Sequence, residues 1–477
     1  MELRNQRVLV VGLGKSGVAS ALFLAQRGAR VAVSDAKSPE QLREEIPLLL
    51  DHGISVETGQ HGERTFRDQD LIVVSPGVPF DVPQLVHARE RGIPVIGEVE
   101  LAARFLKGRI VAITGSNGKT TTTTLAGEVL AAGGYEVLVG GNIGTPAITF
   151  ADRATDNTWL VLEISSFQLE TIQTFHPHIA VVLNVTPDHL DRHHTFENYV
   201  AAKARIFENQ TSSDFAVLSA DDERCVAMAT SAIAPVCWFS RLQEASSGAW
   251  VCNDEIISRN AGGAATVMPI REIALKGAHN LENVLAAVCV GMLAGVEPAR
   301  IRHAVAEFKA VEHRLEYVAT IHDVEYYNDS KATNVDATMK ALESFPGGIY
   351  LILGGKDKGS DYSVLNDLVR ERVKRVYTIG AAAAKIESQV RGTEIVSAGT
   401  LDSAVRRASE AARAGDIVLL APACASFDQF DSYEHRGQVF KDLVRQLAGH
   451  KPEREPHRAK DSREGGPATS GITGDRE

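Results

Sequence analysis

The 477-residue sequence is poor in cysteine and has no long apolar run. Its five cysteines are odd in number and far apart, and no two of them form a Cys-x-x-Cys pair. This pattern argues against a disulfide framework or a zinc knuckle and favours a reducing compartment. No apolar segment reaches the ~18 residues that a membrane-spanning helix needs. The first residues lead directly into a predicted strand and leave no room for a signal peptide, so we expect a cytoplasmic protein.

An excess of basic residues is also missing. Lys and Arg number 50 against 61 Asp and Glu, which gives a formal net charge of −11. Broad binding to nucleic acid needs a basic surface, so we expect no nucleic-acid partner. A local basic pocket for a phosphorylated small molecule is compatible with this charge. We expect a monomer.

The order of strands and helices predicts an α/β fold in three domains. At about 150 residues per domain, the length corresponds to about three of them. In each third, short apolar β-branched runs alternate with helical stretches, which indicates parallel sheets covered by helices. We predict a Rossmann-like N-terminal domain, a central P-loop ATPase-like domain with a parallel sheet, and a Rossmann-like C-terminal domain.

Breaks in this alternation predict where the domains end. We assign residues 1–97 to the first domain, 98–309 to the central domain and 310–450 to the last. Within the central domain, residues 220–277 are more polar and lack long helices, which predicts a small antiparallel excursion. Residues 451–477 are rich in proline, glycine and charge. They cannot bury a core, so we expect a disordered tail.

A glycine-rich segment of the central domain has the form of a phosphate-binding loop. It consists of Gly115, Ser116, Asn117, Gly118, Lys119, Thr120 and Thr121. It follows an apolar strand and opens a helix, so its backbone N–H groups and the helix N-terminus would face phosphate oxygens. Lys119 is predicted to reach the β- and γ-phosphates, and the Thr120 hydroxyl to bind Mg²⁺. The spacing is two residues shorter than the full Walker motif, so a turn that only joins strand to helix is the alternative.

Two polar residues that follow downstream strands are candidate metal ligands. Glu163 lies near the end of the apolar run 159–164. At the carboxyl edge of a parallel sheet it would face the phosphate loop. His189 follows the buried run 179–185. The alternatives are a solvated acid at the end of a strand and a packed or capping histidine.

The first domain carries a second glycine loop. Gly12, Gly14 and Gly17 follow a strand with the spacing Gly-x-Gly-x-x-Gly, and Asp35 ends the next strand. This pattern matches the dinucleotide fingerprint and, alone, would indicate an NAD-dependent oxidoreductase. The loop binds a diphosphate whatever the rest of the ligand, however. Two such loops in one chain therefore indicate two nucleotide ligands, an energy source and a nucleotide-linked substrate.

Six motifs, in order, resemble those of the ATP-dependent Mur ligases. They are the loop 115–121, Leu-Glu-Ile-Ser-Ser-Phe-Gln-Leu-Glu at 162–170, Asn-Val-Thr-Pro-Asp-His-Leu-Asp at 184–191, His-Arg at 313–314, Asn-Asp-Ser-Lys-Ala-Thr-Asn at 328–334, and Ala-Cys-Ala-Ser-Phe-Asp-Gln-Phe at 423–430. Each motif is moderately specific, but six in the right order are very specific together. The resemblance covers about residues 3–449 and is closest to the branch that adds D-glutamate.

The resemblance implies an ATP-dependent amide ligase of peptidoglycan precursor synthesis. Its substrates would be UDP-N-acetylmuramoyl-L-alanine and D-glutamate. ATP would phosphorylate the free carboxylate of the alanyl group, because a carboxylate is a poor electrophile until it carries a leaving group. The amine of D-glutamate would then attack the acyl phosphate and release phosphate. Catalysis of this kind depends mainly on positioning and charge neutralisation.

Carried over position by position, the resemblance also implies site residues. Catalytic roles fall to Lys119, Glu163, His189 and Lys203. ATP would be held by the loop 115–121 with Asn280, Arg314, Asp329 and Lys331. The UDP substrate would contact Gly14, Lys15, Ser16, Asp35, Gly77 and Asn142, and D-glutamate would contact Thr333, Lys358, Ser426 and Phe427. Two Mg²⁺ sites would draw on Thr120, Glu163, His189 and a carbamylated Lys203.

Four alternatives stay open on the residues. Without the resemblance, Lys203 would be interpreted as a solvated helix lysine. A related Mur ligase could use a different amino acid. The first glycine loop with Asp35 still permits an NAD-linked oxidoreductase, and the second loop permits a nucleotide-gated binding module without chemistry.

Overall fold

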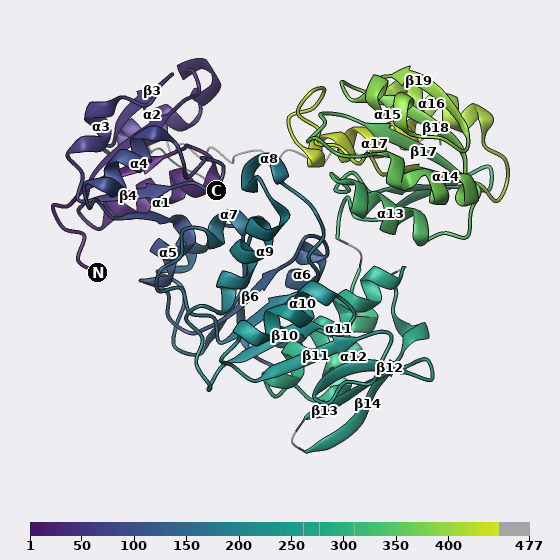
Figure 1. Ribbon diagram of the computed structural model, residues 1–477, viewed down its shortest axis with the longest axis horizontal. Helices are drawn as coiled ribbons and strands as arrows, with labels where there is room; N and C mark the ends of the chain where they lie inside the picture. Colours follow the sequence, from purple (N-terminus) through teal and green to yellow (C-terminus); the bar gives the residue numbers. More distant parts are fainter. Residues whose placement is uncertain (261, 276, 310, 448–477) are drawn as a thin grey trace, which may run out of the picture.

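The computed structural model describes residues 1–260, 262–275, 277–309 and 311–447. Three β-sheets follow one another along the chain, and Figure 1 shows them as three bodies with helices on their faces. We call them the first unit (β1–β5), the second unit (β6–β14) and the third unit (β15–β20). Parallel pairing dominates all three sheets, which confirms the predicted α/β class. The predicted tail, 451–477, lies outside the described residues.

The first unit is a five-stranded parallel sheet in the order β3-β2-β1-β4-β5. The chain changes direction across the sheet between β3 and β4, so the loops after β1 and β4 flank a switch point, where α/β sheets bind ligands. The strands are β1 (Arg7–Val11), β2 (Arg30–Asp35), β3 (Ser55–Thr58), β4 (Leu71–Val74) and β5 (Val95–Gly97). The helices are α1 (Lys15–Gln26), η1 (Pro39–Leu42), α2 (Glu45–Asp51), α3 (Glu63–Arg67) and α4 (Pro83–Glu90).

The second unit is a nine-stranded sheet in the order β14-β13-β12-β11-β10-β9-β6-β8-β7. β6 lies between β8 and β9, so the segments that follow these three strands meet at one carboxyl edge. The strands are β6 (Arg109–Thr114), β7 (Glu136–Gly141), β8 (Thr158–Glu163), β9 (Ile179–Val182), β10 (Phe215–Ser219), β11 (Val236–Ser240), β12 (Gly248–Cys252), β13 (Glu255–Asn260) and β14 (Gly263–Pro269). The helices are α5 (Glu98–Ala103), α6 (Lys119–Ala132), η2 (Ala147–Phe150), α7 (Ser166–Leu169), α8 (Leu190–His193), α9 (Phe196–Ala204), η3 (Arg205–Phe207), α10 (Glu223–Met228), η4 (Ala229–Ser231), η5 (Ile270–Glu272), α11 (Ala278–Leu293) and α12 (Pro298–Glu307).

The third unit is a six-stranded sheet in the order β15-β16-β20-β17-β18-β19, antiparallel only at β15. Since β16, β20 and β17 are neighbours, the loops that leave them lie side by side. The strands are β15 (Glu316–Ile321), β16 (Val324–Asn328), β17 (Ile349–Gly354), β18 (Val373–Ile379), β19 (Glu394–Gly399) and β20 (Ile417–Leu420). The helices are α13 (Val335–Glu343), η6 (Ser363–Leu365), α14 (Asn366–Arg372), α15 (Ala383–Gln389), α16 (Leu401–Ala411) and α17 (Tyr433–Leu447).

The predicted antiparallel excursion at 220–277 is smaller than expected. β10, β11 and β12 continue the central sheet in parallel, and antiparallel pairing starts only between β12 and β13. β13 and β14 form the hairpin at the far end of this sheet (Figure 1). Strands as short as β10, β11 and β12 carry no local signal that separates parallel from antiparallel partners, which explains the difference.

The apolar cores join the first two units to each other but leave the third unit with cores of its own. One cluster is continuous from the first unit into the second and joins Val8 and Leu24 to Ile148 and Phe150. The third unit buries clusters of its own residues. The first two units therefore share a core. Among the described residues, no helix is both long and apolar enough to cross a bilayer.

Candidate active site

Close backbone packing shapes the glycine loop after β1. Gly12 has φ +89°, and a Cβ on Gly17 would lie 1.8 Å from the Gly12 carbonyl oxygen. Glycine is needed at both places, because a side chain would push α1 away from β1. A Cβ on Gly14 would meet nothing within 4 Å, and the same is true of Gly77 in the turn after β4. The predicted UDP-binding positions Gly14 and Gly77 therefore border open space.

Asp35 braces this loop from the end of β2. Its Oδ2 accepts a hydrogen bond of 2.6 Å from the Leu13 backbone N–H, and its Oδ1 accepts one of 2.8 Å from Lys37 N–H. The carboxylate is buried. The structure thus assigns Asp35 a role in holding the loop, and direct contact with the substrate stays a prediction.

The loop 115–118 is held from two sides. Asn184, after β9, accepts from the Ser116 N–H through its carbonyl at 2.9 Å and from the Asn117 N–H through its side chain at 2.9 Å. Gly118 has φ +85°, and a Cβ there would lie 2.1 Å from Asn283 Oδ1 on α11. The loop therefore needs glycine at 118 for both its conformation and its packing.

Lys119 folds over its own loop at the start of α6. Its Nζ donates to the carbonyl oxygens of Gly115 at 2.9 Å and Ser116 at 2.8 Å. Burial lowers the pKa of Lys119, and the charges of Arg314 and Lys358 lower it further, while nearby carboxylates oppose the shift. Cations from the third unit thus lie close enough to Lys119 to repel it.

Thr120 and Glu163 form the centre of the site. The Thr120 hydroxyl donates to Glu163 Oε2 at 2.7 Å, and Asn142 Nδ2 donates to Glu163 Oε1 at 2.9 Å. Lys331 of the third unit donates from Nζ to the Thr120 hydroxyl oxygen. A hydroxyl and a carboxylate are oxygen ligands that suit Mg²⁺. Four predicted site residues are therefore brought together from two units.

Lys203 lies beneath the phosphate loop, on α9. Only 1% of the residue is exposed, and its Nζ donates to the Gly115 carbonyl at 2.8 Å and the Thr114 hydroxyl at 3.4 Å. Its ammonium group also lies 4.6 Å from the ring centroid of Tyr199. Burial lowers the pKa of Lys203 well below its ordinary value, and Lys119 lowers it further. The interpretation of Lys203 as a solvated helix lysine is therefore wrong.

The third unit and α11 enclose the far side of the phosphate loop. Arg314, Asp329 and His279 line one small hollow there together with Asn117 and Gly118. Burial raises the pKa of Asp329 to about 6 and lowers that of His279 to about 3. Among the described residues, Arg314 Nε is buried without a hydrogen-bond partner.

The predicted ATP residue Asn280 lies close to this hollow. It is buried in the first turn of α11, and its Oδ1 accepts a hydrogen bond of 3.1 Å from Asn283 Nδ2. Asn283 itself lines the hollow and accepts from the Thr122 hydroxyl at 3.2 Å. Asn280 is thus linked to the phosphate loop through the side chain of Asn283.

His189 begins the short helix α8 in a left-handed conformation, with φ 53°. Its ring lies edge-on to Phe167, with centroids 4.9 Å apart, and its Nε2 is 3.7 Å from Asp188 Oδ2. Neither His189 nor Lys203, both described residues, lines the cleft that contains Thr120 and Glu163. Their roles as metal ligands stay predictions.

The predicted D-glutamate residues lie on adjacent loops of the third unit. The backbones of Lys356 and Ala425 bond to each other at 2.8 and 3.1 Å, which ties the loop of Lys358 to that of Ser426. Burial raises the pKa of Asp188, but the charges of His189 and Lys358 outweigh it, so the pKa of this carboxyl is lowered. Phe427, in contrast, is 68% exposed. Lys358 thus lies near enough to Lys119 and Asp188 to act on their charges, whereas Phe427 lies at the surface.

One cleft of about 490 Å³ contains residues of all three units. Lys15 and Ser16 come from the first unit, Thr120 and Glu163 from the second, and Lys331 from the third. The remaining lining residues are Gly141, Asn142, Ile143, Gly144, Pro146, Val311, Glu312, His313, Tyr433 and Glu434. The first glycine loop and the phosphate loop thus open into the same space.

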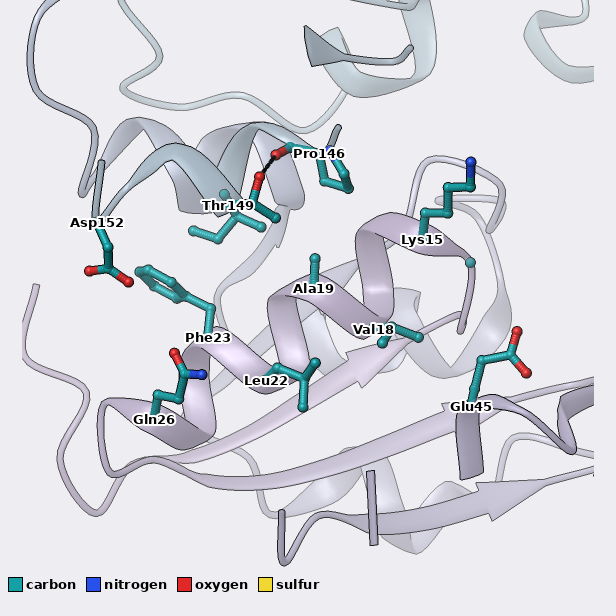
Figure 2. Close-up of a pocket in the computed structure, with 12 residues that line it drawn as sticks. Lys15, Val18, Ala19, Leu22, Phe23, Gln26, Glu45, Pro146, Thr149 and Asp152 are labelled. Atoms are coloured by element: carbon teal, nitrogen blue, oxygen red, sulfur yellow. Dashed lines mark hydrogen bonds between the residues drawn. The ribbon is translucent and has the colours of Figure 1, made fainter. Parts of the chain in front are cut away.

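A second hollow of about 580 Å³ lies between α1 and η2. Figure 2 shows that α1 presents Ala19 and Phe23 toward η2, with Lys15 at one end and Asp152 at the other. Lys15 and Pro146 line both hollows, so the two adjoin. The lining of this second hollow is more apolar than that of the cleft.

Two site residues were not singled out from the sequence. Asp336 accepts from Asn117 Nδ2 on the phosphate loop and from the Thr186 hydroxyl at 3.2 Å. Asn334 donates from Nδ2 to Asp188 at 2.9 Å. Asn334 ends the fifth motif, so its place there was a usable signal. Asp336 carried none, because a lone acid in the first turn of a helix is common.

Models of three known domains match successive parts of the chain. The N-terminal domain of MurD-like Mur ligases matches residues 6–97, the Mur ligase middle domain matches 113–291, and the glutamate ligase domain of Mur ligases matches 313–424. Solved structures agree at the level of the fold. A pseudomurein peptide ligase type C of Methanothermus fervidus covers 93% of this chain and all of its own, with TM-score 0.59 and 18% identity. The UDP-N-acetylmuramate-alanine ligase of Thermotoga maritima covers 94% and 100%, with TM-score 0.57 and 20% identity.

Curated relatives match at much higher identity. A protein of Koribacter versatilis is 68% identical over 94% of this chain and 99% of its own length. One of Acidobacterium capsulatum is 62% identical over 93% and 97%. Both are named UDP-N-acetylmuramoylalanine--D-glutamate ligase. The resemblance drawn from the six motifs is confirmed, and the chain belongs to the Mur ligase family.

Proposed function

We propose that this protein is the ATP-dependent ligase that joins D-glutamate to UDP-N-acetylmuramoyl-L-alanine. The observation that carries the proposal is the cleft in which Thr120 and Glu163 of the second unit meet Lys331 of the third. Lys119 lies near enough to lower the pKa of Lys331. Burial lowers the pKa of Lys331 to about 8, and Arg314 and Lys119 add to the shift. Cations that repel one another in a buried place are typical of a site for a polyanion.

The proposed division of labour follows the three units. Residues 1–97 hold the UDP substrate, with the open positions Gly14 and Gly77 beside the diphosphate. Residues 98–309 hold the phosphates of ATP, and residues 310–450 supply the D-glutamate contacts. The shared cleft supports this division, because a phosphoryl group and an acceptor carboxylate have to meet there.

The roles in the phosphoryl step follow from charge and geometry. Lys119, Lys331 and Arg314 would neutralise the transferred phosphoryl group, and Asn142 would orient Glu163. The Thr120 hydroxyl and the Glu163 carboxylate fit Mg²⁺, which supplies charge neutralisation at the phosphates. His189 is the candidate ligand for a second ion. Asp329 would bind the ribose of the nucleotide, and Asn280 would line its pocket.

The joining step requires the amine of D-glutamate beside the activated carboxyl group. We assign Lys358 to the side-chain carboxylate of D-glutamate, and Thr333, Ser426 and Phe427 to the rest of that substrate. The amine nitrogen attacks the acyl carbon, the C–O bond to phosphate breaks, and a proton leaves the nitrogen. The amide product and phosphate result. Lys15, Ser16 and Asp35 would keep the UDP end in place meanwhile.

The proposal includes a carbamylated Lys203. A lysine that burial leaves neutral is nucleophilic toward CO₂: its nitrogen bonds to the carbon, and one proton leaves to solvent. The product is an anion, which suits a site with metal ions. We further propose that the protein acts as a monomer in the cytoplasm, because the three units of one chain together line the cleft and the reaction consumes ATP.

Release of phosphate tests the proposed function. Purified protein should release it only when UDP-N-acetylmuramoyl-L-alanine, D-glutamate, ATP and Mg²⁺ are all present. Lys119→Ala should lower the rate by at least about a hundredfold, whereas Lys107→Ala, an exposed lysine, should leave it unchanged. Folded protein that releases no phosphate from the full mixture would contradict the proposal.

The remaining alternatives are distinguished by substrate. Replacing D-glutamate with L-alanine, D-alanine, L-lysine or diaminopimelate tests a Mur ligase of different specificity, and D-glutamate should give the highest rate. Tight binding of NADH would favour the oxidoreductase. A partner interaction lost in Lys119→Ala, with no turnover for any amino acid, would favour a binding module.

A further inference from the structure

A buried arginine on α17 lies where three loops of the third unit meet. Arg436 has no exposed surface. Its Nε donates to the Ser330 hydroxyl at 2.9 Å and its Nη2 to the Ser330 carbonyl at 2.7 Å. Its Nη1 donates to the Cys424 carbonyl at 3.1 Å. One planar group therefore binds the loop after β16 and the loop after β20.

The third loop lies against the same guanidinium. A Cβ on Gly355, after β17, would be 3.2 Å from Arg436 Nη1 and 2.3 Å from the Ala425 carbonyl oxygen. The backbone of this loop is also paired with Ala425 through Lys356. Arg436 thus touches the loop that carries Lys358 as well.

Apart from Arg314, which precedes β15, the third-unit residues that the proposed function uses lie on these three loops. Ser330 stands between Asp329 and Lys331, and Lys331 reaches Thr120 in the second unit. Cys424 stands two positions before Ser426. The phosphoryl contacts and the D-glutamate contacts are therefore joined through one side chain.

The hydrogen-bond acceptors of Arg436 are all uncharged, so its burial is not explained by a gain in stability. The three acceptors are a hydroxyl and two carbonyls, and none is a carboxylate. Burial lowers the pKa of Arg436 to about 10, although the charge of Asp428 raises it. Burying a charge that is not hydrogen-bonded to a carboxylate is costly, and an apolar residue of similar size is often more stable in such a place. The rigid fork of an arginine binds two separate groups at a fixed spacing, which a lysine does not do. Cost and geometry together indicate a positioning role.

We infer that Arg436 is a positioning residue that holds the Asp329–Thr333 loop and the Cys424–Phe427 loop at the separation the joining step requires. The inference rests on the proposed function. A change at Arg436 alters how the phosphoryl group and D-glutamate are placed relative to each other. It leaves the UDP end, in the first unit, untouched.

The test is Arg436→Lys, which keeps the charge and loses the fork. We expect kcat to fall by roughly ten- to a hundredfold and the KM values for D-glutamate and ATP to rise together. The KM for the UDP substrate should stay unchanged. The matched control is Arg372→Lys, because Arg372 in the same unit also donates to backbone carbonyls, those of Leu342, Glu343 and Phe345, away from the site loops.

Hydrogen exchange provides a readout that does not depend on activity. Amides of residues 329–334 and 423–430 should exchange faster in Arg436→Lys and unchanged in Arg372→Lys. If Arg436→Lys does not fold, Ser330→Ala, which removes only the Nε acceptor and the 2.8 Å hydrogen bond to the Tyr433 carbonyl, should give the same pattern more weakly.

Two results would overturn the inference. One is a lower kcat of Arg436→Lys with all three KM values unchanged, as expected if only part of the protein is folded and active. The other is hydrogen exchange of both loops at the wild-type rate. Failure of the proposed function gives a different result, because the wild-type protein would then release no phosphate while the exchange difference would still appear.

Discussion

Single buried charges decide much of the behaviour at the residue scale. Lys203 and Glu98 both lie inside the protein, one beneath the phosphate loop and the other where the first two units join. Burial disfavours the charged form of each, so it lowers the pKa of Lys203 and raises that of Glu98. The chemical consequences differ, because a neutral lysine becomes a nucleophile and a neutral carboxyl becomes a pH-dependent element of stability.

The Lys203 side chain is expected to be essential for turnover. Lys203→Ala should lower kcat by at least about a hundredfold, because the site loses a charged group. A small carboxylic acid such as acetate should restore part of the rate by replacing the carbamate, and phosphate release measures both effects. Lys309→Ala, an exposed lysine, serves as the control. Full activity of Lys203→Ala without added acid would rule out the carbamate.

Glu98 is expected to make stability depend on pH. It accepts a hydrogen bond of 2.8 Å from the Ile148 N–H, and burial raises its pKa from 4.5 to about 7. Between these values the folded state keeps a proton that the unfolded state loses, so the stabilising contribution is complete below pH 4.5 and is lost as the pH rises through 7. Glu98→Gln does not titrate and lacks this loss.

Urea unfolding at pH 5 and pH 8 measures the effect of Glu98. Going from pH 5 to pH 8, the stability of Glu98→Gln relative to the wild type should rise by about 3 kcal/mol. Glu90→Gln, at an exposed acid on α4, should show the same difference from the wild type at both pH values. An equal difference for Glu98→Gln at pH 5 and pH 8 would contradict the assignment.

At the element scale, helix α13 connects two functions. Asn334 caps it by accepting a hydrogen bond of 2.8 Å from the Ala337 N–H. The same side chain donates to Asp188 in the second unit at 2.9 Å. One residue therefore both starts a helix and joins the third unit to the segment that precedes His189.

Two substitutions at Asn334 separate these functions. Asn334→Ala removes both interactions and should cost about 1 kcal/mol of stability, because the helix loses its cap. Asn334→Asp keeps a capping oxygen, so stability should fall less than in Asn334→Ala. Its carboxylate would lie beside that of Asp188, however, and repel it, so the contact between the units is still lost. Both variants should lose activity, measured by phosphate release alongside thermal unfolding. Equal melting temperatures for the two variants would show that the cap contributes nothing.

At the scale of the whole molecule, the units are joined in two ways. The first and second units share an apolar core, whereas the third unit reaches the phosphate loop through polar contacts such as Lys331 to Thr120 and Asp336 to Asn117. Polar contacts open at lower cost than a shared core, because little apolar area becomes exposed. The third unit is therefore the part expected to move and to close on bound ligands.

Removing one polar contact should open the molecule. Asp336→Ala loses the bonds to Asn117 and Thr186, so small-angle scattering without ligands should give a larger radius of gyration than for the wild type. An ATP analogue with the UDP substrate should restore the closed value. Asp367→Ala, at an exposed acid of the third unit, is the control. Identical profiles for Asp336→Ala and wild type, with and without ligands, would exclude closure of this kind.

Local signals in the sequence were enough to predict the fold class and the positions of both glycine loops. The alternation of strands and helices acts over a few residues, and the special φ angles of Gly12 and Gly118 belong to single positions, so both can be inferred from neighbours in the chain. The order of the six motifs was enough for the family. These properties depend on short stretches, and the structure changed none of them.

Tertiary structure alone decided which of these residues meet. Lys331 touches Thr120 across 211 positions of sequence, and Arg436 joins Ser330 to Cys424. The order β16-β20-β17 puts three loops at one edge, and no local pattern encodes the neighbours of a strand. The burial of Lys203, which appears on the sequence as an ordinary helix lysine, depends on what packs over α9. Contacts of this kind depend on how whole helix and sheet faces pack together, so only the tertiary structure determines them.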